Sequence, residues 1–313
     1  MRADLVKNAR RGRDIPRPLR AVIIMGMSLS VLSGCSSNDS PGPSTQEESI
    51  AWKLPDKPYP NVRDQIHALF AGQGTRLSAI EELIWRCMRA KNQMYVKIPP
   101  LERDSNPTMT PPEYGQSVAE ARQGYPDKTA EESSRPDPYR DQTDAQQQAW
   151  GEAFFGPESA PKIRVTLPNG EQIETSSQGC LAESQKQVYD SLEEMLKTEN
   201  FAASLPPEAL KRAAADPKLR TLNASWSSCM TEKGQSGLSD PGAARARAAG
   251  SGDGVSVAVA DAECEERMGY AEQREELEDR YLTAALMHYE TEVTALQETN
   301  RAALTRARKI LGS

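Results

Sequence analysis

The sequence has few aromatic residues, few histidines and no long apolar run. Of its 313 residues only 5% are aromatic and two are histidine. No apolar stretch approaches the roughly 20 residues of a membrane-spanning helix, which excludes a protein with several membrane spans. Acidic residues outnumber basic ones, 45 to 38, which argues against nucleic acid as a partner, because phosphates attract a basic surface. With 37% apolar residues we expect a modest core and long solvated segments.

The motifs of common active sites are also missing. His67 and His288 stand in no HExxH or triad-like setting, and there is no GxSxG, GxGxxG or Gly-rich phosphate loop. No CxxC occurs, and the stretch 251–254 lacks the acidic positions of a calcium loop. We therefore expect no catalytic residue, no cofactor and no metal site. A carboxylate pair could still serve glycoside hydrolysis, but most acidic residues lie in charge runs such as Glu265-Glu266 and Glu275–Asp279, which are typical of a solvated face.

The amino terminus has the parts of an export signal. Residues 1–20 hold seven basic and two acidic side chains, and the apolar run Ala21–Leu32 follows. At about 12 residues the run is too short to span a membrane and suits the hydrophobic region of a signal peptide. It ends in Leu32-Ser33-Gly34-Cys35. This sequence resembles the lipobox of bacterial lipoproteins, in which the cysteine receives diacylglycerol and becomes the new amino terminus. The alternative is an ordinary secreted protein whose Cys35 joins a disulfide.

The resemblance implies that Cys35 is the lipidated residue and that the chain is held at the outer face of the bacterial cytoplasmic membrane. Two acyl chains hold a protein stably, whereas one binds only reversibly. Residues 35–50 would then be the lipidated cysteine and a flexible, Ser-rich tether. Removal of residues 1–34 takes away seven of the 38 basic and two of the 45 acidic residues, which leaves a net charge of −12. Such a surface is repelled by anionic headgroups.

The body contains a weak internal repeat. Ile84–Met88 and Ala224–Met230 both include Trp and end in Cys-Met, and Asn92 and Gly234 each stand five residues after the cysteine. Asn and Gly tolerate the left-handed conformation that ends many helices. Both helices are therefore predicted to stop there, before an excursion that returns to a second cysteine at the start of another helix. The Trp sits two residues before the cysteine in one copy and three in the other, so the match is imperfect.

The repeat selects two disulfides. Five cysteines less a lipidated one leave four, which allow three pairings. The repeat favours Cys87–Cys180 and Cys229–Cys264, because each pair then ties the end of one helix to the start of the next. An exported location permits such bonds. In the chain-entropy model, loops of this length make each worth on the order of 4 kcal/mol.

The two excursions differ in composition. Residues 93–160 are rich in Pro, Asp, Gln and Ser, so mostly irregular chain is predicted, with a short helix near Gln146–Phe155. Next, Ile163–Leu167 and Glu171–Thr175 alternate around an Asn-Gly turn, which predicts a β-hairpin that must lie on a helix. In the second excursion, ARARAAGSGDG is expected to be a flexible link.

The C-terminal segment 261–311 has no proline, and only Gly269 interrupts its helical pattern. One mostly apolar face recurs at spacings of four and three. The face comprises Leu282, Leu286, Tyr289, Val293, Leu296, Asn300, Ala303, Ala307 and Ile310. Two interpretations follow: a coiled-coil face for a partner with Asn300 setting the register, or, as we favour, packing on the helix at 181–198 and the helix before Cys229.

These features together resemble a group of actinomycete-type exported lipoproteins of unknown function, over most of residues 62–311. The resemblance rests on Gly179–Glu183 and Asp261–Cys264 as well as the lipobox, and it implies a location and an architecture rather than an activity. Asn92 departs mildly from it, because Gly is expected at this position.

We expect a mainly α fold: disulfide-braced helical hairpins in two related halves, 51–200 and 201–313, with a small β-hairpin and a long C-terminal helix. The function favoured is a membrane-anchored, non-enzymatic module that binds a protein or a cell-wall component. The alternative is a cell-wall hydrolase with a carboxylate pair.

Overall fold

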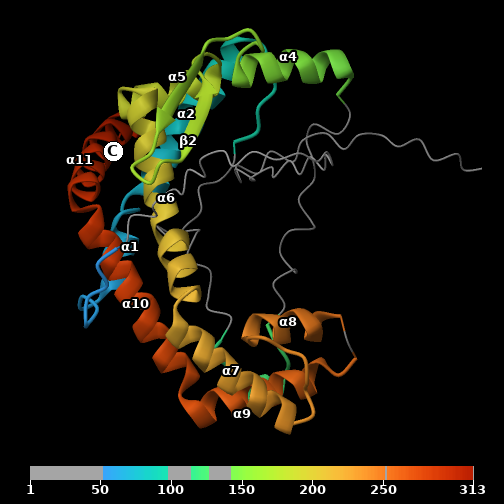
Figure 1. The fold of residues 1–313 in the computed structure, drawn as a ribbon. Helices are drawn as coiled ribbons and strands as arrows, with labels where there is room; N and C mark the ends of the chain where they lie inside the picture. Colours follow the sequence, from blue (N-terminus) through green and yellow to red (C-terminus); the bar gives the residue numbers. More distant parts are fainter. Residues whose placement is uncertain (1–51, 98–113, 127–141, 251, 313) are drawn as a thin grey trace, which may run out of the picture. The chain divides into compact units, whose positions relative to one another are not determined.

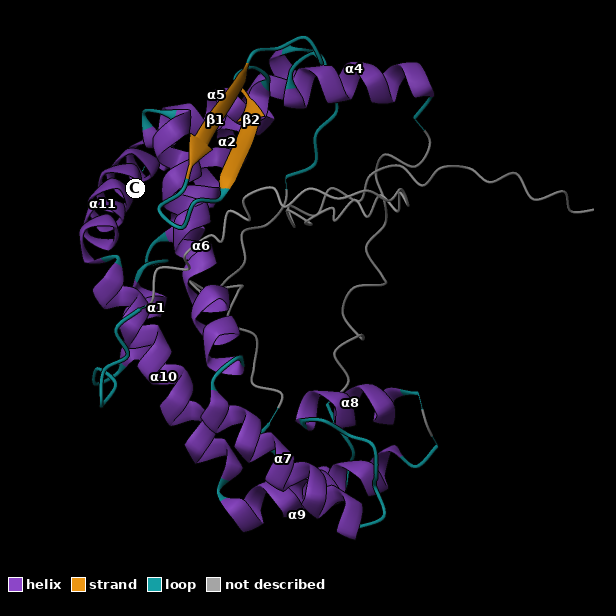
Figure 2. Cartoon of the chain, in the orientation of Figure 1, coloured by secondary structure: helices purple, strands orange, loops and turns teal. Residues whose placement is uncertain are grey.

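The computed structural model describes residues 52–97, 114–126, 142–250 and 252–312. These residues form a mainly helical fold with one two-stranded antiparallel hairpin, which confirms the predicted fold class (Figures 1 and 2). The helices are α1 (Val62–Ala68), α2 (Gln73–Ala90), α3 (Val118–Ala121), α4 (Asp144–Phe155), α5 (Cys180–Tyr189), α6 (Leu192–Ala214), α7 (Pro217–Glu232), α8 (Pro241–Ala249), α9 (Gly254–Met268), α10 (Tyr270–His288) and α11 (Glu290–Leu311). The strands are β1 (Lys162–Thr166) and β2 (Gln172–Ser176). The expected signal peptide and tether lie outside the described residues.

A first apolar core gathers α1, α2, α5, α6, α10, α11 and the hairpin. Helix α2 contributes Ile80, Ile84 and Met88, which recur every fourth residue and so share one face of the helix. Opposite them, α11 presents the small side chains of Ala303 and Ala307, both fully buried. Small residues let two helices approach closely, and α11 makes its most extensive contact with α2. This packing lets a chain with few aromatic residues close its core.

The apolar face of the C-terminal segment is therefore occupied within the chain. Leu282, Leu296 and Ala303 are buried in the first core, against α2, α5 and α6. Asn300 is 7% exposed, and its side-chain amide donates to the main-chain carbonyl of Leu69 at 2.9 Å. The coiled-coil interpretation is wrong for this face, because a partner helix would find it already covered.

The C-terminal helical segment is long but divided. Gly269 takes the left-handed conformation between α9 and α10, as its place in the pattern suggests, and Tyr289 breaks the helix again before α11. The predicted helix at 181–198 is likewise two helices, because Asp190 has a φ of +71° and ends α5. Ser191 then caps α6 by accepting from the amide of Glu194. Helix α6 crosses the predicted boundary between the halves.

The hairpin and the short helix of the first excursion are present as predicted. Val165 and Ile173 face each other across the two strands, and both are buried where β1 lies on α6. Helix α4 begins at a Thr143 capping box. The flexible link expected at ARARAAGSGDG is wrong for its first half: residues 241–249 form α8, because Asp240 caps the helix and Pro241 occupies its first turn.

Both repeated helices end as the repeat predicts. Asn92 and Gly234 have φ values of +56° and +80°. In each copy the amide one residue further on donates, at 2.8 Å, to the carbonyl of the methionine that follows the cysteine, Met88 or Met230. This is the hydrogen bond of a Schellman motif. The equivalent geometry supports a common plan for the two helices.

Alanine substitutions at two glycines separate backbone conformation from packing. An added Cβ would meet nothing within 4 Å at Gly234 or at Gly151, but only Gly234 has a positive φ. We expect Gly234→Ala to lower the free energy of unfolding by roughly 1–2 kcal/mol, and Gly151→Ala, inside α4, to leave it unchanged or raise it. Asn92→Gly should be neutral or stabilising. Denaturant titration measures all three, and equal losses from the two alanine variants would contradict this account.

Candidate functional site

The four cysteines of the described residues form two disulfides, in the pairing expected from the repeat. Cys87 at the end of α2 is bonded to Cys180 at the start of α5, with the two Cα atoms 5.6 Å apart. Cys229 of α7 is bonded to Cys264, with a Cα separation of 5.8 Å. The expectation that Cys264 opens a helix is wrong, because it lies inside α9. Cys35, the predicted lipidation site, is outside the described residues.

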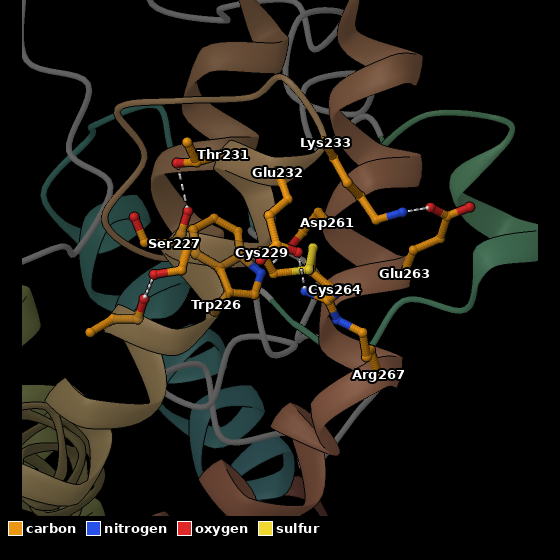
Figure 3. The surroundings of a disulfide bond; sticks show 12 residues. Trp226, Ser227, Cys229, Thr231, Glu232, Lys233, Asp261, Glu263, Cys264 and Arg267 are labelled. Atoms are coloured by element: carbon orange, nitrogen blue, oxygen red, sulfur yellow. Dashed lines mark hydrogen bonds and ion pairs between the residues drawn. A yellow bond between two sulfur atoms is a disulfide. The ribbon is translucent and has the colours of Figure 1, made fainter.

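A second core surrounds the Cys229–Cys264 bond and contains a polar centre (Figure 3). Trp226 and Asp261 each stand three residues before a cysteine of the pair, so they meet one helical turn away from the disulfide. The indole N–H of fully buried Trp226 donates to Oδ1 of Asp261 at 2.9 Å. One turn further along α9 lies Glu265. We call Asp261 and Glu265 the acidic centre; they are 3% and 4% exposed.

The segment 114–126, which includes α3, lies over the acidic centre and is held by carboxyl groups. The hydroxyl of Tyr125 donates to Oδ2 of Asp261 at 2.8 Å, and the amide of Gly115 donates to Glu265. The hydroxyl of Tyr114 donates to Glu278 of α10 at 2.7 Å. We call this segment the strap. Its described polar contacts with α9 and α10 therefore converge on three buried carboxyls.

The two carboxyls of the acidic centre favour a shared proton. Burial, together with the nearby charge of Asp261, raises the pKa of Glu265 to about 8, and the hydrogen bond from the Gly115 amide opposes the rise. Burial also raises the pKa of Asp261, against the hydrogen bonds from Tyr125 and Trp226. Oε1 of Glu265 is buried and has no hydrogen-bond partner among the described residues. A proton on Glu265 removes the charge from that carboxyl and leaves one negative charge on the pair.

The acidic centre is not arranged for hydrolysis. A glycosidase needs its two carboxyls beside a cleft that admits substrate. Asp261 and Glu265 are instead buried and already hydrogen-bonded within the chain. A shallow depression between α7 and α10 is lined by Lys218, Glu276 and Arg280 among others, and neither carboxyl of the pair lines it.

The acidic centre was not predicted from the sequence, because runs of acidic residues are typical of a solvated face. That holds for Glu266, Glu275 and Glu276, which are exposed, but Glu265 and Glu278 are buried. Their spacing held a signal: Glu278 stands four residues before Leu282 on the apolar face of α10, and Glu265 stands four residues after Asp261. An acid at an apolar-face position is a candidate for a buried, hydrogen-bonded carboxyl.

An exposed aromatic surface lies where the chain leaves α2 and meets α4. The rings of Trp150 and Phe154 stack with centroids 4.8 Å apart, and Phe155 meets Phe154 edge-on at 4.6 Å. The indole N–H of Trp150 donates to the carbonyl of Met94 at 2.9 Å, and Tyr95 stacks on Phe154. Three side chains of this surface are 41–51% exposed. They are Met94, Val96 and Phe155. We call these six residues the aromatic surface.

Across residues 52–97, 114–126, 142–250 and 252–312, no helix is long and apolar enough to span a bilayer. The same ranges hold no group of three His, Cys, Asp or Glu side chains placed to bind a metal ion. His67 and His288 are both exposed, and the ring of His288 lies 5.9 Å from that of Trp52. No family model, no curated protein and no solved structure matches the chain.

Phenylalanine substitutions at two tryptophans test the energetic role of the Trp226–Asp261 hydrogen bond. Trp226→Phe keeps an aromatic ring but leaves a buried acceptor without its donor, so we expect the free energy of unfolding to fall by about 1–3 kcal/mol. The control is Trp85→Phe, because Trp85 is half-buried beside Arg89 and Lys97. It should change stability by about 0.5 kcal/mol or less. Chemical denaturation measures both, and equal losses would show that Asp261 does not depend on its indole donor.

Proposed function

We propose that this chain is an exported lipoprotein, anchored through Cys35 to the outer face of the bacterial cytoplasmic membrane, that acts as a non-enzymatic binding or structural module. The observation that carries the proposal is the Leu32-Ser33-Gly34-Cys35 sequence directly after a short apolar run. It is supported by the sulfur count, because the other four cysteines are paired with one another. Disulfides persist outside the reducing cytosol, which agrees with export.

The aromatic surface is the contact face that we propose for this module. Aromatic residues and methionine are enriched where proteins bind one another, and an exposed apolar patch on a soluble body often marks such a site. Met94, Val96 and Phe155 are the exposed apolar side chains of the aromatic surface. The partner we propose is a protein of the cell envelope. A polysaccharide of the wall is the other outcome that the crosslinking experiment below distinguishes.

A cell-wall hydrolase with a carboxylate pair stays the alternative. The raised pKa of Glu265 is the one observation in its favour, because a general acid must stay protonated near neutral pH. The burial of Asp261 and Glu265 opposes it. We therefore favour binding over catalysis.

Mass spectrometry of the mature protein tests the anchor. We expect the chain to begin at Cys35 and to carry the added mass of a diacylglyceryl group on that residue. Cys35→Ala should remain in the precursor form and lose incorporation of labelled fatty acid, whereas Ser36→Ala should behave as the unaltered chain. An unmodified Cys35, or one found in a disulfide, would exclude the proposal.

Site-specific crosslinking in intact cells tests the contact face. A photo-reactive phenylalanine analogue at Phe155 should give a discrete crosslinked protein, because this side chain is 41% exposed beside other apolar groups. The control position is Val255, which is 50% exposed on α9. The same adduct from both positions would count against a specific face. If crosslinking from position 155, and not from position 255, gives products that glycan-cleaving enzymes degrade, the partner is a wall polymer and not a protein.

A further inference from the structure

We propose that the acidic centre is a pH-sensitive latch, which holds the strap in place while Asp261 and Glu265 share a proton and releases it when that proton is lost to solvent. The latch is independent of the function proposed above, because it depends on how segment 114–126 is held and not on the lipid anchor or the aromatic surface. Its parts are the buried carboxyl pair, the donors that the strap offers to it, and the disulfide beside it.

The strap is the layer that can move. Helix α7 also contacts the acidic centre, through Trp226, but Cys229–Cys264 bonds it covalently to α9. No disulfide joins residues 114–126 to α9. Apart from the carboxyl contacts, α3 rests on α9 through small side chains such as Ala121 against Ala258, and Tyr114 packs edge-on against Tyr270 of α10. A rise in repulsion within the pair therefore acts on the strap and not on α7.

The charged and titratable side chains that face the pair come from α8, the strap and α10. Arg245 of α8 lies 4.5 Å over the ring of Tyr125 and lowers the pKa of both carboxyls, as a smaller effect than burial. Tyr125 of the strap and Tyr270 of α10 are the neighbouring phenols, and burial raises the pKa of each. Burial keeps both phenols neutral between pH 5.5 and 8. Of these neighbouring groups, the carboxyl pair is therefore the one that loses a proton over that range.

A second set of ions lies on the outer side of α9 and does not enter the centre. Lys233 pairs with Glu263, and Arg267 pairs with Glu232 (Figure 3). The side chain of Glu263 is 41% exposed. Glu263 is therefore a matched control: an acid on the same helix, two residues from Glu265, that solvent already reaches.

The direction of the pH effect follows from the raised pKa. Glu265 keeps its proton up to about pH 8 while the strap is closed, but its ordinary value is 4.5 once water reaches it. Between these values opening releases one proton, so the equilibrium constant for opening rises about tenfold per pH unit. Below pH 4.5 both states are protonated, and above pH 8 both are ionised, so the constant is level at each end. The strap is most firmly closed in acid.

Amide exchange of the full chain, followed residue by residue by NMR, tests the latch. The reporters are the amides of Gly115, which donates to Glu265, and of Ala121, which donates within α3. Dividing each observed rate by its intrinsic rate removes the pH dependence of the exchange chemistry. We expect the opening constant at both amides to rise about tenfold per pH unit between pH 5.5 and 8. The opening constant at the amide of Lys233, at the end of α7, should not change over this range.

Two variants separate the latch from general destabilisation. In Glu265→Gln the side chain is uncharged like the protonated acid, its carbonyl accepts from the Gly115 amide as Glu265 does, and it does not titrate. The opening constant of this variant should therefore lack the tenfold rise per pH unit, and the strap amides should still be protected from exchange at pH 8. Glu263→Gln should keep the slope of the unaltered chain.

The proposal is overturned by a flat profile in the unaltered chain, or by an unchanged slope in Glu265→Gln. It is also overturned if Lys233 opens with the same slope as the strap, because the whole body would then be unfolding. If Glu265→Gln does not fold, the pH series of the unaltered chain and of Glu263→Gln still decides the matter.

Discussion

The Cys229–Cys264 bond is the constraint on which the second half of the structure depends. It fixes α7 against α9 at the turn where Trp226 and Asp261 meet. That contact orients the carboxyl toward the strap, so that its second oxygen can accept from Tyr125. A covalent bond thus holds a buried acid in a position that apolar packing alone would not favour, because burial of a carboxyl is costly until its hydrogen bonds are made.

The first half of the structure contains a buried cation. Arg76 is 1% exposed at the junction of α2, α5 and α6. Its guanidinium donates to the hydroxyl of Tyr189 at 2.8 Å and to Oε1 of Glu199 at 3.2 Å, and a third donor reaches the carbonyl of Ala71 at 2.8 Å. Such a group stabilises only when its donors are satisfied, so it selects one arrangement of the three helices. Both halves therefore combine a disulfide with a buried polar cluster.

Local features of this fold were readable from sequence, and long-range polar contacts were not. The Asn-Gly turn, the two helix stops and the apolar face of α11 depend on neighbouring residues, and each is where the pattern puts it. Tyr125 lies 136 residues from Asp261, and Gly115 lies 150 residues from Glu265. No spacing rule joins residues so far apart. The centre could be suspected only from acids at apolar-face positions, and the donors that satisfy them follow from the tertiary fold.

The similarity between the two disulfide-bonded helix pairs does not extend to the acidic centre. Three residues before the first cysteine of each pair, the first half has Ile84 and the second has Trp226, and both are buried. Counting from the second cysteine, Leu181 occupies the place of Glu265. Ser177 occupies the place of Asp261, so neither matching position of the first half carries a carboxyl. Helices with equivalent stops can therefore border different interiors, and the buried carboxyl pair belongs to the second of them.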